Sequence, residues 1–279
     1  MELIRGFHNI SARHKGCVAT IGAFDGVHHG HQAVLEQLMA KGRELGLPST
    51  VVVFEPLPRE FFSPHEAPAR LMSFREKFAA LEALGIDRVM RIRFDESFRE
   101  MGAMPFIRKL FVDGLDAKYI VVGDDLRFGR NRSGDFNLLR EYGLKDGFEV
   151  EDTSTLKISG ERVSSTRIRE VLAQSDFALA ERLLGRPYSI SGRVVMGKQL
   201  GRTINAPTAN LQLRRLRSPL SGVFAVEVSG LGEAPLQGVA NVGVRPTVGD
   251  LSEAILEVLR NINLDALREQ LLVEMNSTS

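Results

Sequence analysis

Cysteine is nearly absent from this sequence: Cys17 is the only one among 279 residues. An intrachain disulfide is therefore excluded, and so is a zinc site built from several thiolates of this chain. Such low cysteine usage is typical of proteins from reducing compartments, so we expect a cytoplasmic location.

Long hydrophobic runs and an excess of one charge are missing as well. No stretch approaches the ~18 apolar residues of a transmembrane helix, and the first residues lack the apolar core of a signal peptide. Lysine and arginine number 36 against 35 aspartates and glutamates, which gives a net charge of +1. We therefore expect no membrane association and no nucleic-acid partner, and any anionic ligand must be captured locally.

Tryptophan is absent and tyrosine numbers 3, so the 16 phenylalanines must fill the cores and supply any stacking on a ring ligand. The rest of the composition is ordinary, with 43% hydrophobic and 25% charged residues. A chain of this length is long enough for two modest cores, so two domains are expected.

The N-terminal part alternates β-branched runs with helical patterns. Apolar residues recur at three- and four-residue spacing in the segments around Leu35, Phe78 and Phe106, as expected for helices that pack on a sheet. The pattern predicts an α/β domain with a parallel sheet, whose ligands sit beyond the carboxyl ends of the strands. The predicted strands cover residues 17–21, 50–54, 88–92, 119–122 and 148–151.

The residue pattern changes after two helical stretches, at residues 165–174 and 176–184. The second stretch ends at Gly185. We therefore place the domains at 1–185 and 186–279. Short alternating strands with glycine turns follow, which predict a small antiparallel barrel. They cover residues 188–196, 222–228, 237–242 and 254–258. The tail, 263–274, has leucines at helical spacing and is predicted to be a terminal helix that caps the barrel.

The first predicted strand runs into Gly22-Ala-Phe-Asp-Gly-Val-His-His-Gly-His31, and an amphipathic helix follows. The glycines permit a tight backbone bend, and the free N–H groups at the helix start favour an anion. His28 and His31 lie three residues apart and can project toward one ligand. As imidazolium donors they would stabilise charge on a phosphoryl group.

His28-x-Gly30-His31 resembles the HxGH signature of the nucleotidyltransferase superfamily. The longer string is similar to the prokaryotic bifunctional riboflavin kinase/FAD synthetase family. The resemblance implies a Rossmann-like FMN adenylyltransferase domain in which His28 and His31 are catalytic and ATP is the co-substrate. Nucleotide contacts are implied for Gly22, Phe24, Asp25 and Gly30.

Two further segments of this domain resemble the family. Residues 162–169, Arg-Val-Ser-Ser-Thr-Arg-Ile-Arg, are similar to its ISSTxIR motif, in which hydroxyl and N–H groups at a helix start meet phosphate. Residues 122–129 are similar to a GxDFRFG loop, with Leu126 in place of phenylalanine, and 54–59 are similar to a segment near the flavin. The phosphate-binding residues implied here are Asp125, Arg162, Ser164, Ser165, Thr166 and Arg167.

The C-terminal domain carries a second glycine-rich basic loop, 192–202, followed by Asn205-Ala-Pro-Thr-Ala-Asn210. Together they resemble the flavokinase domain, whose fold is a six-stranded antiparallel barrel. Gly197, Lys198, Gly201 and Arg202 could fold over polyphosphate, and Pro207 would stiffen the turn. Thr208 and Asn210 offer neutral oxygens to Mg²⁺, or to Mn²⁺ or another divalent ion.

Glu257 matches the family's L-E-V-H strand, which implies that its carboxylate is the base for the ribityl hydroxyl of riboflavin. Taken alone, a glutamate on an alternating strand is more often a solvated residue. The sequence departs from the family pattern after Val258, where a segment and at least one barrel strand of that pattern are missing. Either the kinase domain is truncated or residues are absent from this sequence; an open barrel would expose strand edges, which favours absent residues.

The resemblance as a whole implies FAD biosynthesis: ATP-dependent phosphorylation of riboflavin to FMN, then adenylylation of FMN to FAD with release of pyrophosphate. Riboflavin, FMN, FAD and ATP are the expected small-molecule partners, and the oligomeric state is left open. Two alternatives stay open at this point. One is an adenylyltransferase with a degenerate barrel, and the other is a flavin-binding protein without catalytic activity.

Overall fold

The computed structural model describes residues 1–123, 125–153, 155–195, 208–213, 215–244, 252–258 and 270–275. The chain forms two compact units. The N-terminal unit comprises Met1–Ala67 and Lys77–Val163, and the C-terminal unit comprises Pro68–Glu76 and Ser164–Ser279. A short stretch from the first half of the sequence therefore belongs to the C-terminal unit.

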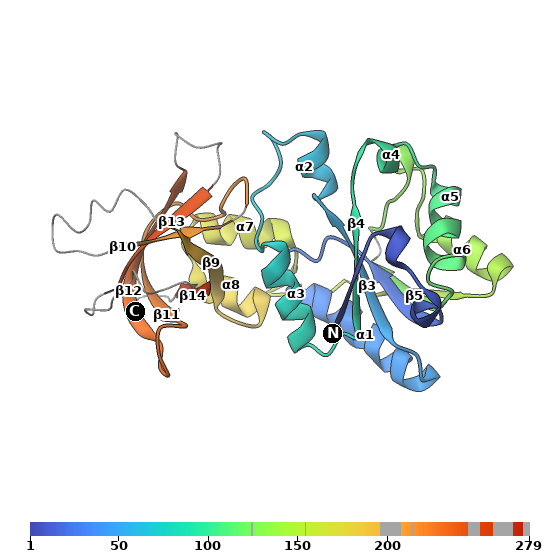
Figure 1. Cartoon of the computed structure of the whole chain (residues 1–279), viewed down its shortest axis with the longest axis horizontal. Helices are drawn as coiled ribbons and strands as arrows, with labels where there is room; N and C mark the ends of the chain where they lie inside the picture. Colours follow the sequence, from blue (N-terminus) through green and yellow to red (C-terminus); the bar gives the residue numbers. More distant parts are fainter. Residues whose placement is uncertain are drawn as a thin grey trace. The chain divides into compact units, whose positions relative to one another are not determined.

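The N-terminal unit is built on a six-stranded sheet in the order β1-β4-β3-β2-β5-β6, with every neighbouring pair parallel (Figure 1). The five strands predicted from the sequence are all present, and an edge strand, β1, was not predicted. The strands are β1 (Glu2–Arg5), β2 (Cys17–Ile21), β3 (Ser49–Glu55), β4 (Arg88–Arg93), β5 (Ala117–Gly123) and β6 (Glu149–Thr153).

Helices cover both faces of this sheet. On one face, Gly42 of α1 approaches the Val18 side chain of β2, and a Cβ at Gly42 would lie 3.1 Å from it. On the other, α5 and the π-helical turn Arg108–Val112 contribute Phe106 and Phe111 to a buried cluster that also contains Ala19. The helices of the chain are α1 (His29–Leu45), α2 (Pro58–Phe62), α3 (Phe74–Ala83), α4 (Glu96–Arg99), α5 (Ala103–Ile107), α6 (Phe136–Asp146), α7 (Ser165–Ala173) and α8 (Phe177–Leu184).

The strand order places a topological switch between β2 and β5. From β2 the chain adds β3 and β4 on one side, and then returns to add β5 and β6 on the other. In open parallel sheets of this kind, the loops diverge at the carboxyl ends of the two central strands and leave a crevice for ligands. The turn that carries the two histidines follows β2 at this edge.

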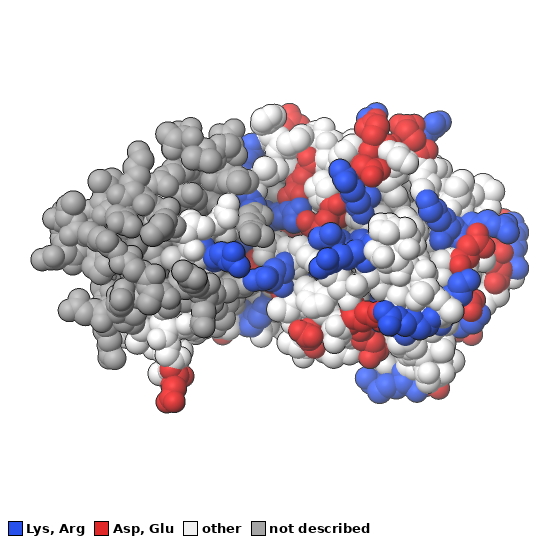
Figure 2. Space-filling model, in the orientation of Figure 1, with Lys and Arg blue, Asp and Glu red and all other residues white. Residues whose placement is uncertain are grey.

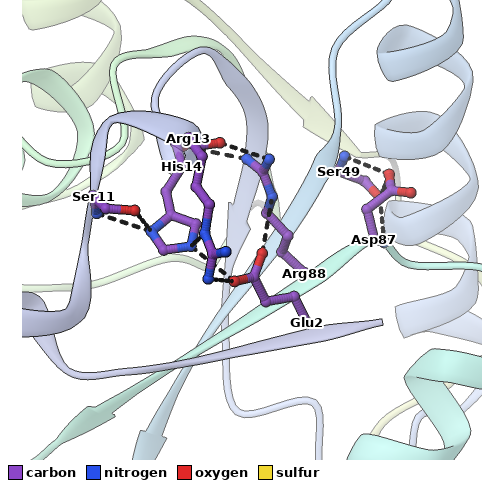
Figure 3. Close-up of polar contacts among 7 residues, drawn as sticks. All are labelled: Glu2, Ser11, Arg13, His14, Ser49, Asp87 and Arg88. Atoms are coloured by element: carbon purple, nitrogen blue, oxygen red, sulfur yellow. Dashed lines mark hydrogen bonds and ion pairs between the residues drawn. The ribbon is translucent and has the colours of Figure 1, made fainter.

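A polar network fastens the opposite, amino-terminal edge of the sheet (Figure 3). The Glu2 carboxylate on β1 accepts hydrogen bonds from Arg13 at 2.6 Å and lies 3.0 Å from His14 Nε2. Arg88 on β4 donates to the Arg13 carbonyl at 2.8 Å. These contacts attach the edge strand β1 to its neighbour in the sheet.

The C-terminal unit contains α7, α8 and a closed antiparallel barrel in the order β10-β13-β12-β11-β14-β9. Its strands are β9 (Tyr188–Val195), β10 (Thr208–Gln212), β11 (Gly222–Ser229), β12 (Leu236–Val244), β13 (Ser252–Val258) and β14 (Gln270–Met275). The α/β fold class and the barrel are confirmed.

The terminal helix predicted over 263–274 is wrong from Gln270 on, because Gln270–Met275 form β14. This strand pairs with β9 and with β11, so it closes the barrel that the sequence suggested was short of a strand. Residues 259–269, where the predicted helix would begin and the segment after Val258 would be missing, lie outside the described residues.

Candidate functional site

A strained turn joins β2 to α1. Phe24 has φ +46°, Gly26 +90° and Val27 +42°, so three of four consecutive residues adopt the left-handed region. This conformation is ordinary for glycine and rare for a β-branched residue, and each such residue costs about 1–3 kcal/mol. Val27 is fully buried and Phe24 is nearly so, and their packing holds the turn in this conformation.

His28 is the N-cap of α1. Its Nδ1 atom accepts a hydrogen bond from the backbone N–H of His31 at 3.3 Å. The same N–H also donates to the His28 carbonyl oxygen at 2.8 Å. Because Nδ1 accepts, the proton of the ring belongs on Nε2. His28 is therefore assigned as a neutral imidazole with an Nε2–H donor.

The His31 ring stacks on the His28 ring, with the centroids 3.7 Å apart and the planes at 16°, and Phe24 packs against it at 5.1 Å. Burial is the main cause that holds the pKa of His31 well below its ordinary value. Its Nδ1 atom is sealed from solvent and meets no hydrogen-bond partner among the described residues.

These two histidines therefore differ from the sequence-based expectation in one respect. Imidazolium donors were expected, but the cap bond at His28 and the lowered pKa of His31 favour neutral rings. Neutral imidazoles can still donate an N–H to a phosphate oxygen. The positive potential of the turn then comes from the helix N-terminus and from other side chains.

Gly30 is required by close packing at the start of α1. A Cβ atom at this position would lie 3.2 Å from Cε1 and Nδ1 of His28 and 3.2 Å from the carbonyl oxygen of Val163. A backbone carbonyl cannot move aside as a flexible side chain can. The HxGH spacing thus has a steric reason: the residue directly before His31 must lack a side chain.

Asp125 and Arg162 form an ion pair at 3.1 Å, with Asp125 just beyond β5 and Arg162 on the short strand β8 (Glu161–Arg162). Both side chains are largely exposed, so the pair itself adds little stability. It places a guanidinium and a carboxylate near the carboxyl end of a central strand. Asp124 lies outside the described residues.

The second predicted phosphate anchor lies in the C-terminal unit. Ser164 is the N-cap of α7, and its hydroxyl accepts a hydrogen bond from the Arg167 N–H at 3.2 Å. Ser165 and Thr166 occupy the first turn of this helix. The local geometry matches the expected helix start, while the pairing of this anchor with the two histidines stays a prediction.

A phenylalanine cluster lines the carboxyl ends of β3 and β4. Phe54 lies 5.8 Å from Phe94, and Phe94 lies 5.4 Å from Phe98, 5.3 Å from Phe61 and 5.6 Å from Phe62. Phe62 is 55% exposed, an unusual environment for a large apolar ring. The cluster offers aromatic faces at the same sheet edge as the histidine turn.

In the barrel, Thr208 stands directly opposite Glu257, and Asn210 stands opposite Ile255, in the pairing of β10 with β13. Cross-strand partners share a face of the sheet, as do residues two apart on one strand. Thr208, Asn210 and Glu257 are thus placed on one face. The predicted loop residues Gly197, Lys198, Gly201, Arg202 and Pro207 lie outside the described residues.

The oxygen donors of Thr208 and Asn210 fit Mg²⁺ by their chemistry, because this ion prefers hard oxygen ligands and keeps several waters. Asn210 is 8% exposed, so its amide would be a buried ligand. No cluster of three or more histidine, cysteine, aspartate or glutamate side chains that could hold a metal occurs in the described part of the chain.

Sequence reasoning missed Lys77. This residue lies on α3 and is 1% exposed, and it is the smallest of the three causes that lower the pKa of His31. The helical pattern of its segment was recognised from Phe74, Phe78, Leu81 and Leu84. A lysine in such a pattern is ordinarily solvated, so the sequence carried no signal for its burial.

Two family models match the chain. One, described as FAD synthetase, matches residues 10–167, and the other, described as riboflavin kinase, matches residues 184–277. Their boundaries leave α7 largely between the two matches.

Curated relatives match nearly the whole chain. A bifunctional riboflavin kinase/FMN adenylyltransferase from Escherichia coli (strain K12) is 52% identical over 266 residues, which are 95% of this chain and 85% of that protein. One from Pseudomonas fluorescens is 52% identical and covers 92% and 82%, and one from Haemophilus influenzae is 48% identical and covers 92% and 83%.

A solved structure described as a macrolide-efflux protein from Streptococcus pneumoniae also resembles the chain. It has a TM-score of 0.80 and 27% identity, and the match covers 99% of this chain and 90% of that one. Within the described residues of the present structure, no helix has the length and apolarity needed to cross a membrane.

Proposed function

Because the chain belongs to the family of bifunctional riboflavin kinase/FMN adenylyltransferases, it phosphorylates riboflavin to FMN and adenylylates FMN to FAD, and we propose which residues perform each step. Adenylyl transfer is assigned to the turn of His28 and His31, and phosphorylation to the barrel. The observation that carries this assignment is the strained, buried turn that presents two stacked imidazoles at the topological switch of the sheet.

For adenylyl transfer, an FMN phosphate oxygen attacks the α-phosphorus of ATP, a new P–O bond forms, and the bond to pyrophosphate breaks. His28 donates its Nε2–H to a phosphate oxygen and so stabilises the developing charge. The N–H groups at the start of α1 attract the same charge. Gly22, Phe24, Asp25 and Gly30 shape the turn that binds the nucleotide.

We also assign phosphate binding to Ser164, Ser165, Thr166 and Arg167 at the start of α7, and to Asp125 and Arg162 near the carboxyl end of β5. Their hydroxyls and guanidinium groups would hold the departing pyrophosphate. The phenylalanine cluster at the ends of β3 and β4 supports a flavin position at the same edge, because stacked aromatic faces suit a planar ring.

For phosphorylation, Glu257 accepts the proton of the ribityl 5′-hydroxyl as this oxygen attacks the γ-phosphorus of ATP; the new P–O bond forms, the bond to the β,γ-bridging oxygen breaks, and ADP leaves. Thr208 and Asn210 would hold Mg²⁺, or Mn²⁺ in its place, and the ion would neutralise phosphate charge. The register that places Thr208 opposite Glu257 supports a single site for base and metal. Gly197, Lys198, Gly201, Arg202 and Pro207 are assigned to the phosphate loop.

We further propose 1–185 and 186–279 as the two functional domains, in line with the ranges of the two family matches. The barrel domain is proposed to lack a segment after Val258 relative to its relatives. Riboflavin, FMN, FAD and ATP are its partners, and the cytoplasm, where these cosubstrates are available, is its proposed location.

The decisive experiment is the product profile from riboflavin and Mg-ATP, resolved by chromatography. The wild-type chain should produce FMN and then FAD. His31→Ala should accumulate FMN without FAD, and Glu257→Gln should produce no FMN from riboflavin while still converting added FMN to FAD. Loss of both activities in either variant, with the fold intact, would refute the two-site assignment.

A further inference from the structure

The residue that precedes His28 is held in a strained conformation. Val27 has φ +42° and is fully buried, although a β-branched residue rarely adopts the left-handed region. Such a conformation persists only where the surrounding structure fixes it. The backbone at Val27 also sets the direction in which the next side chain, that of His28, leaves the chain. A contact that holds the Val27 carbonyl therefore helps to orient the His28 ring.

Gln32, in the first turn of α1, binds the carbonyl groups on both sides of the His28 α-carbon. Its side-chain Nε2–H donates to the Val27 carbonyl oxygen at 2.9 Å, and its backbone N–H donates to the His28 carbonyl oxygen at 2.9 Å. The backbone bond is the ordinary helical one, which any residue except proline can make. The side-chain bond requires a donor, because a carbonyl oxygen can only accept.

The Val27 carbonyl lies one residue before the helical bonds of α1 begin. Those bonds start at the His28 carbonyl, which accepts from the N–H groups of His31 and Gln32. A buried carbonyl needs a donor from within the protein, and the Gln32 amide provides one for Val27. Loss of this amide would leave the helix and its cap in place but release the peptide before His28. The effect would fall on the orientation of one ring.

We infer that Gln32 is a positioning residue for adenylyl transfer: its side-chain amide fixes the peptide before His28 and so directs the Nε2–H of that ring at the phosphate. Two bonds act on His28 together, because Gln32 holds the backbone before it and the His31 N–H holds its Nδ1 atom. With both fixed, the Nε2–H has a defined direction. This inference rests on the proposed assignment of adenylyl transfer to the histidine turn.

Gln32→Met tests the inference, because methionine has a similar length and helix propensity but cannot donate a hydrogen bond. We expect kcat for FAD formation from FMN to fall about 10- to 100-fold, the cost of a small misplacement of a reacting group. KM for ATP should stay close to the wild-type value, because the weakened interaction belongs to the transition state. A purely structural role predicts a lower unfolding midpoint with kcat per folded molecule unchanged, and that result would overturn the inference.

Two matched variants show whether the donated bond is responsible. Gln32→Glu keeps a side-chain oxygen but loses the amide donor, so it should lose at least as much kcat as Gln32→Met. Glu36→Met changes an exposed residue one turn further along the same helix and should have no effect. Wild-type kcat in Gln32→Glu would show that the bond to Val27 is dispensable and would refute the role of Gln32.

A double-mutant cycle shows whether Gln32 acts through His28. In the His28→Asn background the Nε2–H is absent, so adding Gln32→Met should lower kcat by less than about twofold more. The same fold-loss in both backgrounds would contradict positioning through His28. The cycle also separates this inference from the proposed function. If His28→Asn retains FAD synthesis, the site assignment fails; if it loses FAD synthesis while Gln32→Met does not, only the role of Gln32 fails.

A measurement on the wild-type protein covers the case in which the variants do not fold. The side-chain amide protons of Gln32 should exchange with solvent more slowly than those of the exposed Gln174, because one of them is bonded to the buried Val27 carbonyl. NMR measures both rates in the same sample. Equal rates for the two side chains would mean that the bond to Val27 does not persist in solution, and the inference would then be wrong.

Discussion

His28 has two separable tasks at the residue scale, because its Nδ1 atom caps α1 and its Nε2–H is assigned to a phosphate oxygen. Asparagine is also a good N-cap but cannot reproduce the Nε2–H. We expect His28→Asn to retain the wild-type stability within about 0.5 kcal/mol and to lower the rate of FAD formation by about 10²- to 10³-fold. Chemical denaturation and FMN adenylylation assays measure the two effects. His28→Ala is the control and should lose the cap as well as the activity.

Gly30 provides a second test at this scale. Alanine favours helix formation over glycine by about 1 kcal/mol, so Gly30→Ala should not unfold α1. Its Cβ would instead push the His28 ring or the Val163 carbonyl, each only 3.2 Å away. We expect FAD synthesis to fall by about 10²-fold, the cost of a small misplacement of a reacting group, with riboflavin phosphorylation unchanged. Gly232→Ala, where the new Cβ meets nothing within 4 Å, is the control. Normal FAD synthesis in Gly30→Ala would show that this close packing is unimportant.

At the scale of elements, a buried ion pair joins the segment Pro68–Glu76 to the rest of the C-terminal unit. Arg215 Nη2 lies 2.8 Å from Glu76 Oε2, with the side chains 0% and 6% exposed, and Arg215 also donates to the Leu71 carbonyl. Arg215→Met would leave the Glu76 carboxylate buried and unpaired, at a cost of about 3–5 kcal/mol. The unfolding midpoint in denaturant should fall accordingly. Arg217→Met, at an exposed neighbouring position, should have little effect, and a similar loss in both variants would contradict this explanation.

The network at β1 predicts a pH dependence of stability. The hydrogen bond from His14, followed by the charges of Arg13 and Arg88, holds the pKa of Glu2 below its ordinary value. A carboxyl whose folded-state pKa is lowered stabilises the protein above the unfolded-state pKa, and this contribution is lost as the pH falls through the folded-state pKa. Glu2→Gln should therefore lower the free energy of unfolding at pH 7 and have a smaller effect at acid pH. Because Glu2 is 35% exposed, the difference should stay below about 1 kcal/mol. An equal effect at both pH values would refute the electrostatic role.

The sequence predicted helices and strands well where a residue pattern was clear along the chain. It predicted them poorly where a segment depends on pairing partners far away in the sequence. The strands of the parallel sheet appeared as β-branched runs, and each is present. The tail was misjudged because leucines 264, 267, 271 and 272 fit a helical period. The six residues Gln270–Met275 instead form a strand because β9 and β11 offer them open edges. The burial of Lys77 was not predicted for the same reason, since no local pattern shows which side chain distant parts of the chain will cover.

At the scale of the whole molecule, FMN links the two reactions, because riboflavin phosphorylation produces it and adenylyl transfer consumes it. The molecule carries the proposed sites in different compact units: His28 and His31 in one, and Glu257 in the other. On the face seen in Figure 2, the described surface carries charges of both signs, and neither sign covers it. We expect FMN to leave the unit that makes it, so that FMN made by one molecule is available to another.

Complementation between full-length variants tests this picture. Neither His28→Asn nor Glu257→Gln should make FAD from riboflavin and Mg-ATP when alone, because the first lacks adenylyl transfer and the second lacks phosphorylation. An equimolar mixture should make FAD after a lag, during which FMN accumulates, and added FMN should abolish the lag. Chromatographic time courses measure FMN and FAD. The references are riboflavin phosphorylation and FMN adenylylation by the wild-type protein. If the mixture makes no FAD although each variant retains its remaining activity, FMN does not leave the molecule that makes it, and the two sites work only within one chain.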